Sequence, residues 1–228
     1  MKELGILFLH YHIDEIVLNN LESVRRYNPN AEIVTMSTNK EVLPGGYSVD
    51  DTPKIKGLHS VDPYLSSDWL VCSWHAQKRE ACKKWWIVEW DVFCTMSVHD
   101  YYQPVWNFPF VASCVRLPYR DPEWFWFNHI RKLPAQYRPY AMGASPFIYL
   151  IDDHALGHIC AALLKTPFET ICEFRFATAA NASGYPPCGY SPPGDGITWV
   201  PWKALPWKRG IFHPVKFRAI PVAGSTFS

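Results

Sequence analysis

Two carboxylates, Glu89 and Asp91, interrupt the apolar segment WWIVEWDVF at residues 85–93. The segment predicts a buried strand, in which residues two apart point to the same face, so the two acids are expected side by side. Unpaired carboxylates in an apolar core are costly, so a cation must neutralise them. Two sources of positive charge are available: the nearby basic side chains of Arg79, Lys83 and Lys84, or a bound metal ion.

A divalent metal ion suits the position of the two acids. In a parallel α/β sheet, ligands bind beyond the C-terminal ends of the strands, where Glu89 and Asp91 are expected. Carboxylate oxygens without thiolates or paired imidazoles favour Mg²⁺ or Mn²⁺, which usually join one or two protein carboxylates to substrate phosphates. We therefore hypothesise a Mn²⁺ or Mg²⁺ site that binds a diphosphate. A solvated strand end or a salt bridge to the basic side chains is the alternative.

The N-terminal third predicts a strand–helix–strand unit. Residues 4–11 form an apolar run, and residues 14–31 place apolar side chains on one helical face, with Asp14 as N-cap and Pro29 as the stop. Residues 31–38 then predict a second strand. Such a unit is typical of a parallel sheet.

The rest of the chain continues the alternation of helices and strands. After a loop-rich link at 39–64, we expect a helix at 66–85 leading into the strand at 85–93, strands at 108–115 and 145–151, and a capped helix at 152–165. From Pro167 onward the chain is rich in Pro, Gly and Trp and predicts irregular structure. The pattern favours one α/β domain with a mostly parallel central sheet flanked by helices and an irregular C-terminal third.

Composition excludes several classes of function. The 228 residues carry a formal net charge of +1, so no overall field attracts nucleic acid or an anionic membrane. No apolar run reaches the roughly 18 residues that span a bilayer. The N-terminus lacks a small-residue cleavage site and predicts a strand instead of a signal peptide. The seven cysteines have no zinc spacing, which favours reduced thiols and a cytoplasmic protein.

The acidic pair at the end of a strand near residue 90, after a strand–helix–strand unit and a further helix, resembles the nucleotide-sugar glycosyltransferases of the GT-A fold. Their strand-end motif is Asp-x-Asp or Glu-x-Asp, and the sequence AMGASPFIYLIDDHALGHI at 141–159 is similar to the strand and helix that follow it. The resemblance covers about residues 3–216. It implies Mn²⁺ or Mg²⁺, a nucleotide-sugar donor and a glycan-type acceptor. Asp91 would be the direct metal ligand, and Glu89 would face the metal's waters or the donor's ribose.

Two later stretches extend the resemblance. The sequence CEFRFATAANASGY at 172–185 is similar to an acceptor-side segment, in which Glu173 would be the general base of an inverting enzyme. Arg175 would contact a donor phosphate, or else pair with Glu173 on the surface. The resemblance divides the single domain into a nucleotide-binding half, residues 1–115, and an acceptor-side half with a C-terminal tail, residues 116–228.

The C-terminal sequence GIFHPVK at 210–216 is similar to the C-terminal His and Lys of several subfamilies. By this resemblance His213 completes the metal shell and Lys216 contacts the diphosphate. Without it, His213 before a proline is a turn residue. His10, at the end of the first strand, would line the nucleotide pocket, as could His12.

Two other functions are weighed against transfer of a sugar. Sugar-phosphate nucleotidyltransferases resemble one another in a Gly-rich, basic loop after the first strand, but this chain reads HYHIDEIVLNN there, without glycine, lysine or arginine. A non-catalytic module could instead use the 11 tryptophans and the other aromatic residues to bind a glycan or a protein. Such a module would need neither a metal nor Asp91.

Overall fold

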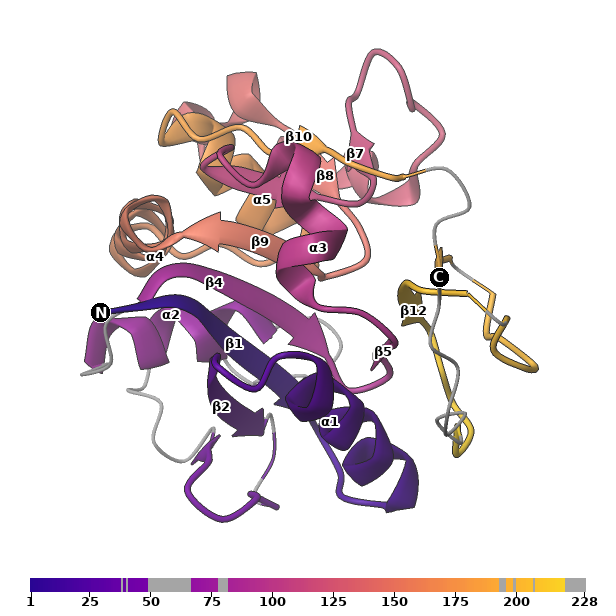
Figure 1. Ribbon diagram of the computed structural model, residues 1–228. Coiled ribbons are helices and arrows are strands. Elements are labelled where there is room, and N and C mark those ends of the chain that lie inside the picture. Colours follow the sequence, from indigo (N-terminus) through magenta and orange to yellow (C-terminus); the bar gives the residue numbers. More distant parts are fainter. Residues whose placement is uncertain are drawn as a thin grey trace.

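The computed structural model describes residues 1–37, 39, 41–48, 67–77, 82–192, 196–198, 200–206 and 208–219. A seven-stranded sheet with the order β10-β6-β9-β4-β1-β2-β3 lies at its centre (Figure 1). Its strands are β1 (Lys2–His10), β2 (Glu32–Ser37), β3 (Tyr47–Ser48), β4 (Cys82–Glu89), β6 (Phe110–Ala112), β9 (Tyr149–Asp152) and β10 (Cys188–Gly189). Within this sheet β9 runs antiparallel to both neighbours, and the other pairs are parallel. The prediction of a mostly parallel α/β sheet is confirmed.

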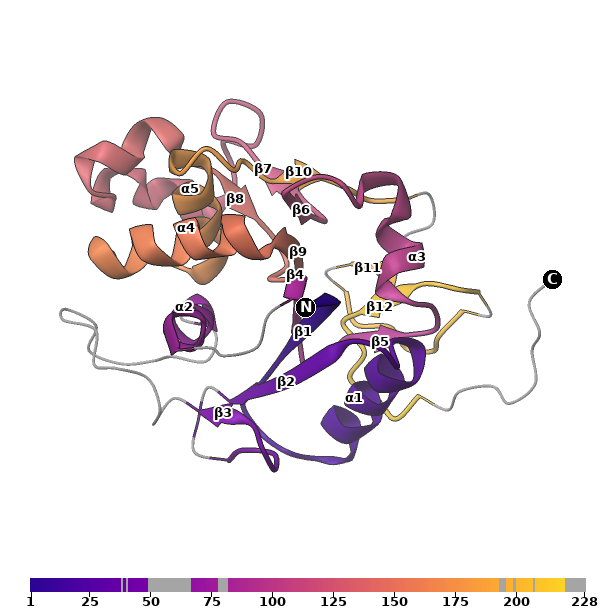
Figure 2. The same cartoon turned by 60° about the vertical axis from the view of Figure 1, so that its left-hand side comes forward.

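Helices cover both faces of the sheet. They are α1 (Glu15–Tyr27), α2 (Ser67–Gln77), α3 (Val98–Tyr102), α4 (Asp153–Lys165) and α5 (Cys172–Ala182), with 3-10 turns η2 (Gln103–Val105), η3 (Phe125–Lys132) and η4 (Ala135–Tyr140). Helix α1 lies on one side, and α2, α4 and α5 lie on the other (Figure 2). Successive residues of β1 alternate accordingly: Ile6 and Phe8 pack toward α1, while Leu7 and Leu9 pack toward α2 and α5. Burial on both faces explains why β1 and β4 are almost continuously apolar.

The predicted strand–helix–strand unit is present, and its helix begins where the capping residue predicts. The Asp14 carboxylate accepts hydrogen bonds from the backbone N–H groups of Ile16 (2.9 Å) and Val17 (2.8 Å). Helix α1 ends at Tyr27, two residues before Pro29. Because side-chain capping satisfies N–H groups that a helix start leaves open, it fixes the helix start locally.

Close packing between β1 and β4 depends on one glycine. Gly5 pairs with Trp85 in the parallel register, and a Cβ atom at residue 5 would lie 2.2 Å from the Trp85 ring. The indole therefore occupies space that a side chain would fill. Its Nε1 donates a hydrogen bond to Asp153 at 2.7 Å, which links β4 to the start of α4.

The elements around the acidic pair differ from the prediction. Helix α2 ends at Gln77 and residues 82–85 belong to β4, so the predicted helix at 66–85 is too long; residues 78–81, with Arg79, lie outside the described part of the chain. Strand β4 ends at Glu89, and Asp91 lies in the following turn, where the Val92 N–H donates to the Glu89 carbonyl at 3.3 Å. The expectation that one strand presents both acids is therefore wrong.

The later strands are also shorter than predicted. The expected strand at 108–115 is divided into β6 and β7 (Val115–Arg116), and β7 pairs with β8 (Gly143–Ala144) instead of joining the central sheet. The expected strand at 145–151 is β9, at Tyr149–Asp152, and α4 follows it, but the N-cap residue Asp152 makes no capping hydrogen bond and instead accepts one from Lys84. Within the described residues, no helix is both long enough and apolar enough to cross a membrane.

The C-terminal third is more regular than predicted. It contains α5, whose side chains are nearly all buried from Cys172 to Ala180, so it has no polar face from which its periodicity could be recognised. It also contributes two strands of a small sheet ordered β11-β12-β5: β11 (Gly196–Ile197), β12 (Ile211–His213) and β5 (Phe93–Cys94). Strand β12 runs antiparallel to β5, which brings residues 211–213 back to the turn after β4.

Candidate active site

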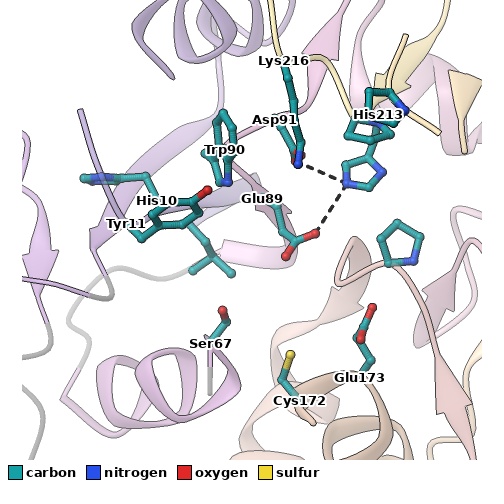
Figure 3. Close-up of a pocket in the computed structure, with 14 residues that line it drawn as sticks. His10, Tyr11, Ser67, Glu89, Trp90, Asp91, Cys172, Glu173, His213 and Lys216 are labelled. Atoms are coloured by element: carbon teal, nitrogen blue, oxygen red, sulfur yellow. Dashed lines mark ion pairs between the residues drawn. The ribbon is translucent and has the colours of Figure 1, made fainter. Parts of the chain in front are cut away.

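A pocket of about 180 Å³ lies at the C-terminal ends of β1 and β4 (Figure 3). One wall carries Glu89, Asp91, His213 and Lys216, and Glu173 lies at the start of α5 on the opposite side. Charged and aromatic side chains both line this pocket, so it can accommodate a polar ligand that also has an apolar part.

Three potential metal ligands converge on one wall of this pocket. One ligand atom from each of Glu89, Asp91 and His213 lies within 4.8 Å of the others. His213 Nε2 lies 3.3 Å from Asp91 Oδ1 and 3.6 Å from Glu89 Oε2. The structure thus brings together the three side chains that the sequence assigned to a metal or its surroundings, although Asp91 reaches the cluster from a turn.

Strand register brings His213 to Asp91. Residues Ile211 and Phe212 of β12 pair with Cys94 and Phe93 of β5, so the antiparallel direction carries residue 213 back toward the 90–91 turn. Beyond β12, the Val215 N–H donates to the Asp91 carbonyl at 2.7 Å. This backbone hydrogen bond joins the two segments directly at the site.

Burial and mutual charge set the protonation of the cluster. Burial lowers the pKa of His213, but its contacts with Asp91 and Glu89 outweigh this effect and raise the pKa to about 9. Burial raises the pKa of Glu89, as does the charge of Asp91, while His213 and Lys216 act in the opposite direction. The imidazolium of His213 therefore offsets part of the negative charge of the two acids beside it.

The tautomer of His213 is fixed by its second ring nitrogen. Nδ1 lies 3.2 Å from the Thr198 carbonyl oxygen, which can only accept a hydrogen bond, so Nδ1 carries a proton. When the imidazole is neutral, Nε2 presents its lone pair to the two carboxylates. A backbone carbonyl on the far nitrogen is the usual way to orient a metal-binding histidine.

The structure places Lys216 beside Asp91 and Trp90. Its Nζ lies 3.6 Å from Asp91 Oδ2 and 5.5 Å from the centroid of the Trp90 ring. The side chain is 43% exposed, so the ammonium can turn toward a ligand in the pocket without leaving a buried position. The aromatic face and the carboxylate hold this cation at the pocket's edge.

Glu173 lies in the first turn of α5, where the Ser145 hydroxyl donates a hydrogen bond to it. Burial raises the pKa of Glu173 to about 7, against the opposing effect of the Ser145 hydrogen bond. A carboxyl group with such a pKa is poised to exchange a proton at neutral pH. Ser145 follows β8, and nothing in the local sequence indicated that it would meet Glu173.

Arg175 is not part of the pocket. Its Nε donates to Asp68 Oδ2 at 2.7 Å and its Nη2 to Asp68 Oδ1 at 2.5 Å, and the guanidinium packs against the Trp69 ring. Nη1 donates to the Thr170 carbonyl just before α5. The structure thus separates Arg175 from the other predicted site residues and pairs it with an acid on α2, not with Glu173.

His10 lines the pocket and is almost completely buried. Burial lowers its pKa, and its Nδ1 lies 3.2 Å from the His12 carbonyl oxygen. His12 itself is not among the lining residues; its Nε2 lies 3.2 Å from Asp14. The neutral form of His10 is therefore favoured in the ligand-free pocket.

Two aromatic side chains of the pocket were not singled out as site residues from the sequence. Tyr11 follows β1, Trp90 follows β4, and their rings meet edge to face at a centroid distance of 5.5 Å. Both follow the C-terminal ends of neighbouring parallel strands, which is the signal that could have identified them. They offer an apolar surface beside the charged cluster.

The donor set fits Mn²⁺ or Mg²⁺. Two carboxylates and one imidazole are ligands that Mn²⁺ accepts readily, and the carboxylates alone suit Mg²⁺. Asp91 Oδ1 is buried and makes no hydrogen bond of ordinary geometry among the described residues, although it faces His213. An oxygen in that situation has unused coordinating capacity that a cation would satisfy.

The chain is similar to several solved glycosyltransferase structures. The galactosyltransferase LgtC in complex with donor and acceptor sugar analogs is 12% identical over 79% of this chain and 70% of that chain, with a TM-score of 0.40. The apo form of mouse xyloside xylosyltransferase 1 is 12% identical over 87% and 88%, with a TM-score of 0.48. The bifunctional glycosyltransferase WbbM is 8% identical over 81% of this chain and 38% of that chain, with a TM-score of 0.45.

No family model and no curated protein matches the chain. Similarities this distant assign neither a family nor an activity, so function has to be argued from the pocket.

Proposed function

We propose that this protein is a metal-dependent glycosyltransferase that moves a sugar from a nucleoside-diphosphate sugar to a hydroxyl group of a glycan-type acceptor, with inversion at the anomeric carbon. The observation that carries the proposal is the convergence of Glu89, Asp91 and His213 beyond the end of a parallel strand, with a carboxyl group of raised pKa, Glu173, facing them across one pocket. A cation site and a proton acceptor on opposite walls match the two needs of sugar transfer: charge neutralisation and deprotonation.

The donor side of the pocket would bind the diphosphate. Asp91, His213 and Glu89 would hold Mn²⁺ or Mg²⁺, and a metal bound there supplies Lewis-acid neutralisation of the diphosphate charge. Lys216 would turn from Asp91 toward a phosphate oxygen and add a second positive charge. His10, neutral and buried, would line the nucleotide pocket, and Tyr11 and Trp90 would flank it.

The acceptor side would activate the attacking hydroxyl. Glu173, as a carboxylate, would take the proton while the acceptor oxygen forms a bond to the anomeric carbon from the face opposite the diphosphate. The bond from that carbon to the phosphate oxygen breaks, and its electron pair leaves with the nucleoside diphosphate. Backside displacement in one step inverts the anomeric centre.

The two halves of the chain would divide this work. Residues 1–115 would supply most of the nucleotide-binding surface, residues 116–228 the acceptor side, and the segment at 210–216 would return to the donor side. The seven cysteines are free thiols in the structure, which supports a reducing compartment such as the cytoplasm as the place of action.

The proposal is tested by metal-dependent donor binding. A panel of nucleoside diphosphates and nucleotide sugars is titrated with and without Mn²⁺, and melting temperature and Kd are measured. A ligand at 100 times its Kd adds about 2.7 kcal/mol to the free energy of unfolding, which raises the melting temperature of a chain of this size by roughly 5–10 °C. We expect at least one nucleotide to give such a shift only when Mn²⁺ is present.

Asp91→Asn should abolish this shift, because it removes the buried carboxylate nearest to His213. Asp100→Asn is the matched control, since Asp100 is an exposed acid on α3 that pairs with Arg209. A Mn²⁺-independent shift, or an Asp91→Asn protein that binds as the wild type does, would refute the metal assignment. Glycan binding without any nucleotide or metal dependence would favour the non-catalytic module instead.

A further inference from the structure

Asn20, a buried residue of α1, contacts both segments that carry the cation site. Its Nδ2 donates to the Trp90 carbonyl at 3.1 Å and to the Val215 carbonyl at 3.0 Å. The side chain is completely buried. One amide group thus joins Trp90 and Val215, which lie 125 positions apart in the sequence.

The two carbonyl groups belong to the backbone next to the ligands. Trp90 lies between Glu89 and Asp91, and Val215 lies two residues after His213 and one before Lys216. The Val215 N–H also donates to the Asp91 carbonyl at 2.7 Å. Asn20 therefore closes a ring of hydrogen bonds in which both site segments are held at fixed separation from α1.

We propose that Asn20 is a positioning residue for the Glu89–Asp91–His213 cation site, an inference that rests on the proposed metal-dependent function. Two carbonyl oxygens facing one point repel each other unless a donor lies between them, and an NH₂ group supplies two N–H donors in one plane. Removing it takes this partner from a buried acceptor, the Val215 carbonyl, and a partly buried one, the Trp90 carbonyl, and lets the segments move apart. Loss of groups that orient metal ligands typically costs about 10–100-fold in metal affinity.

The same helix provides a matched control. Asn28, at the C-terminal end of α1, is also buried; its Nδ2 donates to the Val24 carbonyl at 2.9 Å and its Oδ1 accepts from the Val98 N–H at 2.9 Å. Asn28 therefore makes two hydrogen bonds to backbone, as Asn20 does. Its partners lie on α1 and at the start of α3, and neither is adjacent to a proposed ligand.

The test compares Mn²⁺ affinity with stability in the wild type, Asn20→Ala and Asn28→Ala. Free Mn²⁺ is measured by electron paramagnetic resonance during titration of the metal alone, and unfolding in urea is followed for each protein. We expect Asn20→Ala to raise the Kd for Mn²⁺ about 10–100-fold, and Asn28→Ala to change it less than about twofold at a comparable loss of stability.

A milder variant keeps the test decisive if Asn20→Ala does not fold. Asn20→Ser retains one shorter donor and should give a smaller loss of Mn²⁺ affinity in a folded protein. Equal Mn²⁺ affinity in the Asn20 and Asn28 variants, with the wild type binding normally, would overturn the positioning role alone. A wild-type protein that binds no Mn²⁺ would refute the proposed function and this inference with it.

Discussion

The negative charges of the Glu89 and Asp91 carboxylates are balanced by the side chains of His213 and Lys216. The two lysines of β4 have other partners, because Lys83 pairs with Glu3 and Lys84 with Asp152. Two cations that come from the far end of the chain therefore balance the charge of the two acids. A divalent metal would replace the proton of His213 and release Lys216 from Asp91.

Glu173 lies in a different environment from this cluster. Burial raises its pKa, as it does that of Glu89, but the hydrogen-bond partner of Glu173 is the neutral hydroxyl of Ser145, whereas Glu89 faces the cation of His213. Carboxyl groups with such different partners can take different roles in one site. This difference is the residue-level basis for assigning proton transfer to Glu173 and cation binding to Glu89 and Asp91.

Glu173→Gln should keep metal-dependent donor binding and lose turnover. Glutamine preserves the size of the side chain and can still accept the Ser145 hydrogen bond, but it cannot take a proton at neutral pH. We expect kcat to fall by roughly 10²-fold or more, the usual contribution of a general base. Transfer is measured as release of nucleoside diphosphate, and normal turnover in this variant would exclude Glu173 as the base.

Ser145→Ala tests the same role through pH dependence. A base must be deprotonated, so kcat/KM of the wild type should fall about tenfold per pH unit below the pKa of Glu173, about 7. The Ser145 hydrogen bond stabilises the charged carboxylate, so its removal raises that pKa and should move the acidic limb to higher pH. An acidic limb that stays in place would assign it to another group.

At the scale of the elements, α5 presents Glu173 because Arg175 anchors the start of the helix. The guanidinium binds Asp68 on α2 through two N–H groups and also bonds the Thr170 carbonyl. Arg175→Met should lower the free energy of unfolding by about 3–5 kcal/mol, because it leaves Asp68 as an uncompensated buried charge. Denaturation in urea measures the loss.

Two further variants identify the cause of that loss. Adding Asp68→Asn to Arg175→Met removes the orphaned charge and should recover part of the stability. Lys2→Met breaks the exposed Lys2–Glu32 pair and should cost no more than about 1 kcal/mol. If Arg175→Met costs as little as Lys2→Met, Arg175 does not anchor α5.

Elements with local signals could be predicted from the sequence. The Asp14 cap fixed the start of α1, and the apolar runs of β1 and β2 indicated a parallel sheet. The acids at 89 and 91 were expected at the edge of the sheet where the parallel strands end, and the structure places both of them in a pocket there. The predicted boundary between α2 and β4 was wrong because Cys82, Lys83 and Lys84 belong to a strand whose lysines find partners on neighbouring strands.

Contacts between distant segments could not be predicted from local sequence features, and only the resemblance placed His213 near Asp91. The pairing of β12 with β5 joins residues 211–212 to 93–94, and no local feature of either segment specifies the other. Helix α5 has no polar face, so its sequence lacks the periodicity of an amphipathic helix. The separation of Arg175 from the pocket follows from Asp68, which lies 107 residues earlier.

At the scale of the whole molecule, the site joins segments that lie far apart in the sequence. His10 comes from β1, Glu89 and Asp91 from the end of β4, Glu173 from α5, and His213 with Lys216 from the last described segment. Because the pocket exists only when all these elements are packed, the ionisation of its groups is linked to global unfolding. The raised pKa of Glu173 therefore has a consequence for stability.

Glu173→Gln should stabilise the ligand-free protein above neutral pH. The folded state binds the Glu173 proton up to a pH of about 7, whereas the unfolded chain releases it near the ordinary value of 4.5. The folded state thus holds more protons between these values, and the contribution of Glu173 to stability falls as pH rises through that window. Glutamine has no such dependence.

We expect the free energy of unfolding of the variant, minus that of the wild type, to be on the order of 2 kcal/mol larger at pH 8 than at pH 5. Urea denaturation at both pH values measures this difference, and the exposed Glu123→Gln should show almost none. A difference that is the same at both pH values would mean that Glu173 is not held in a folded environment that favours its protonated form.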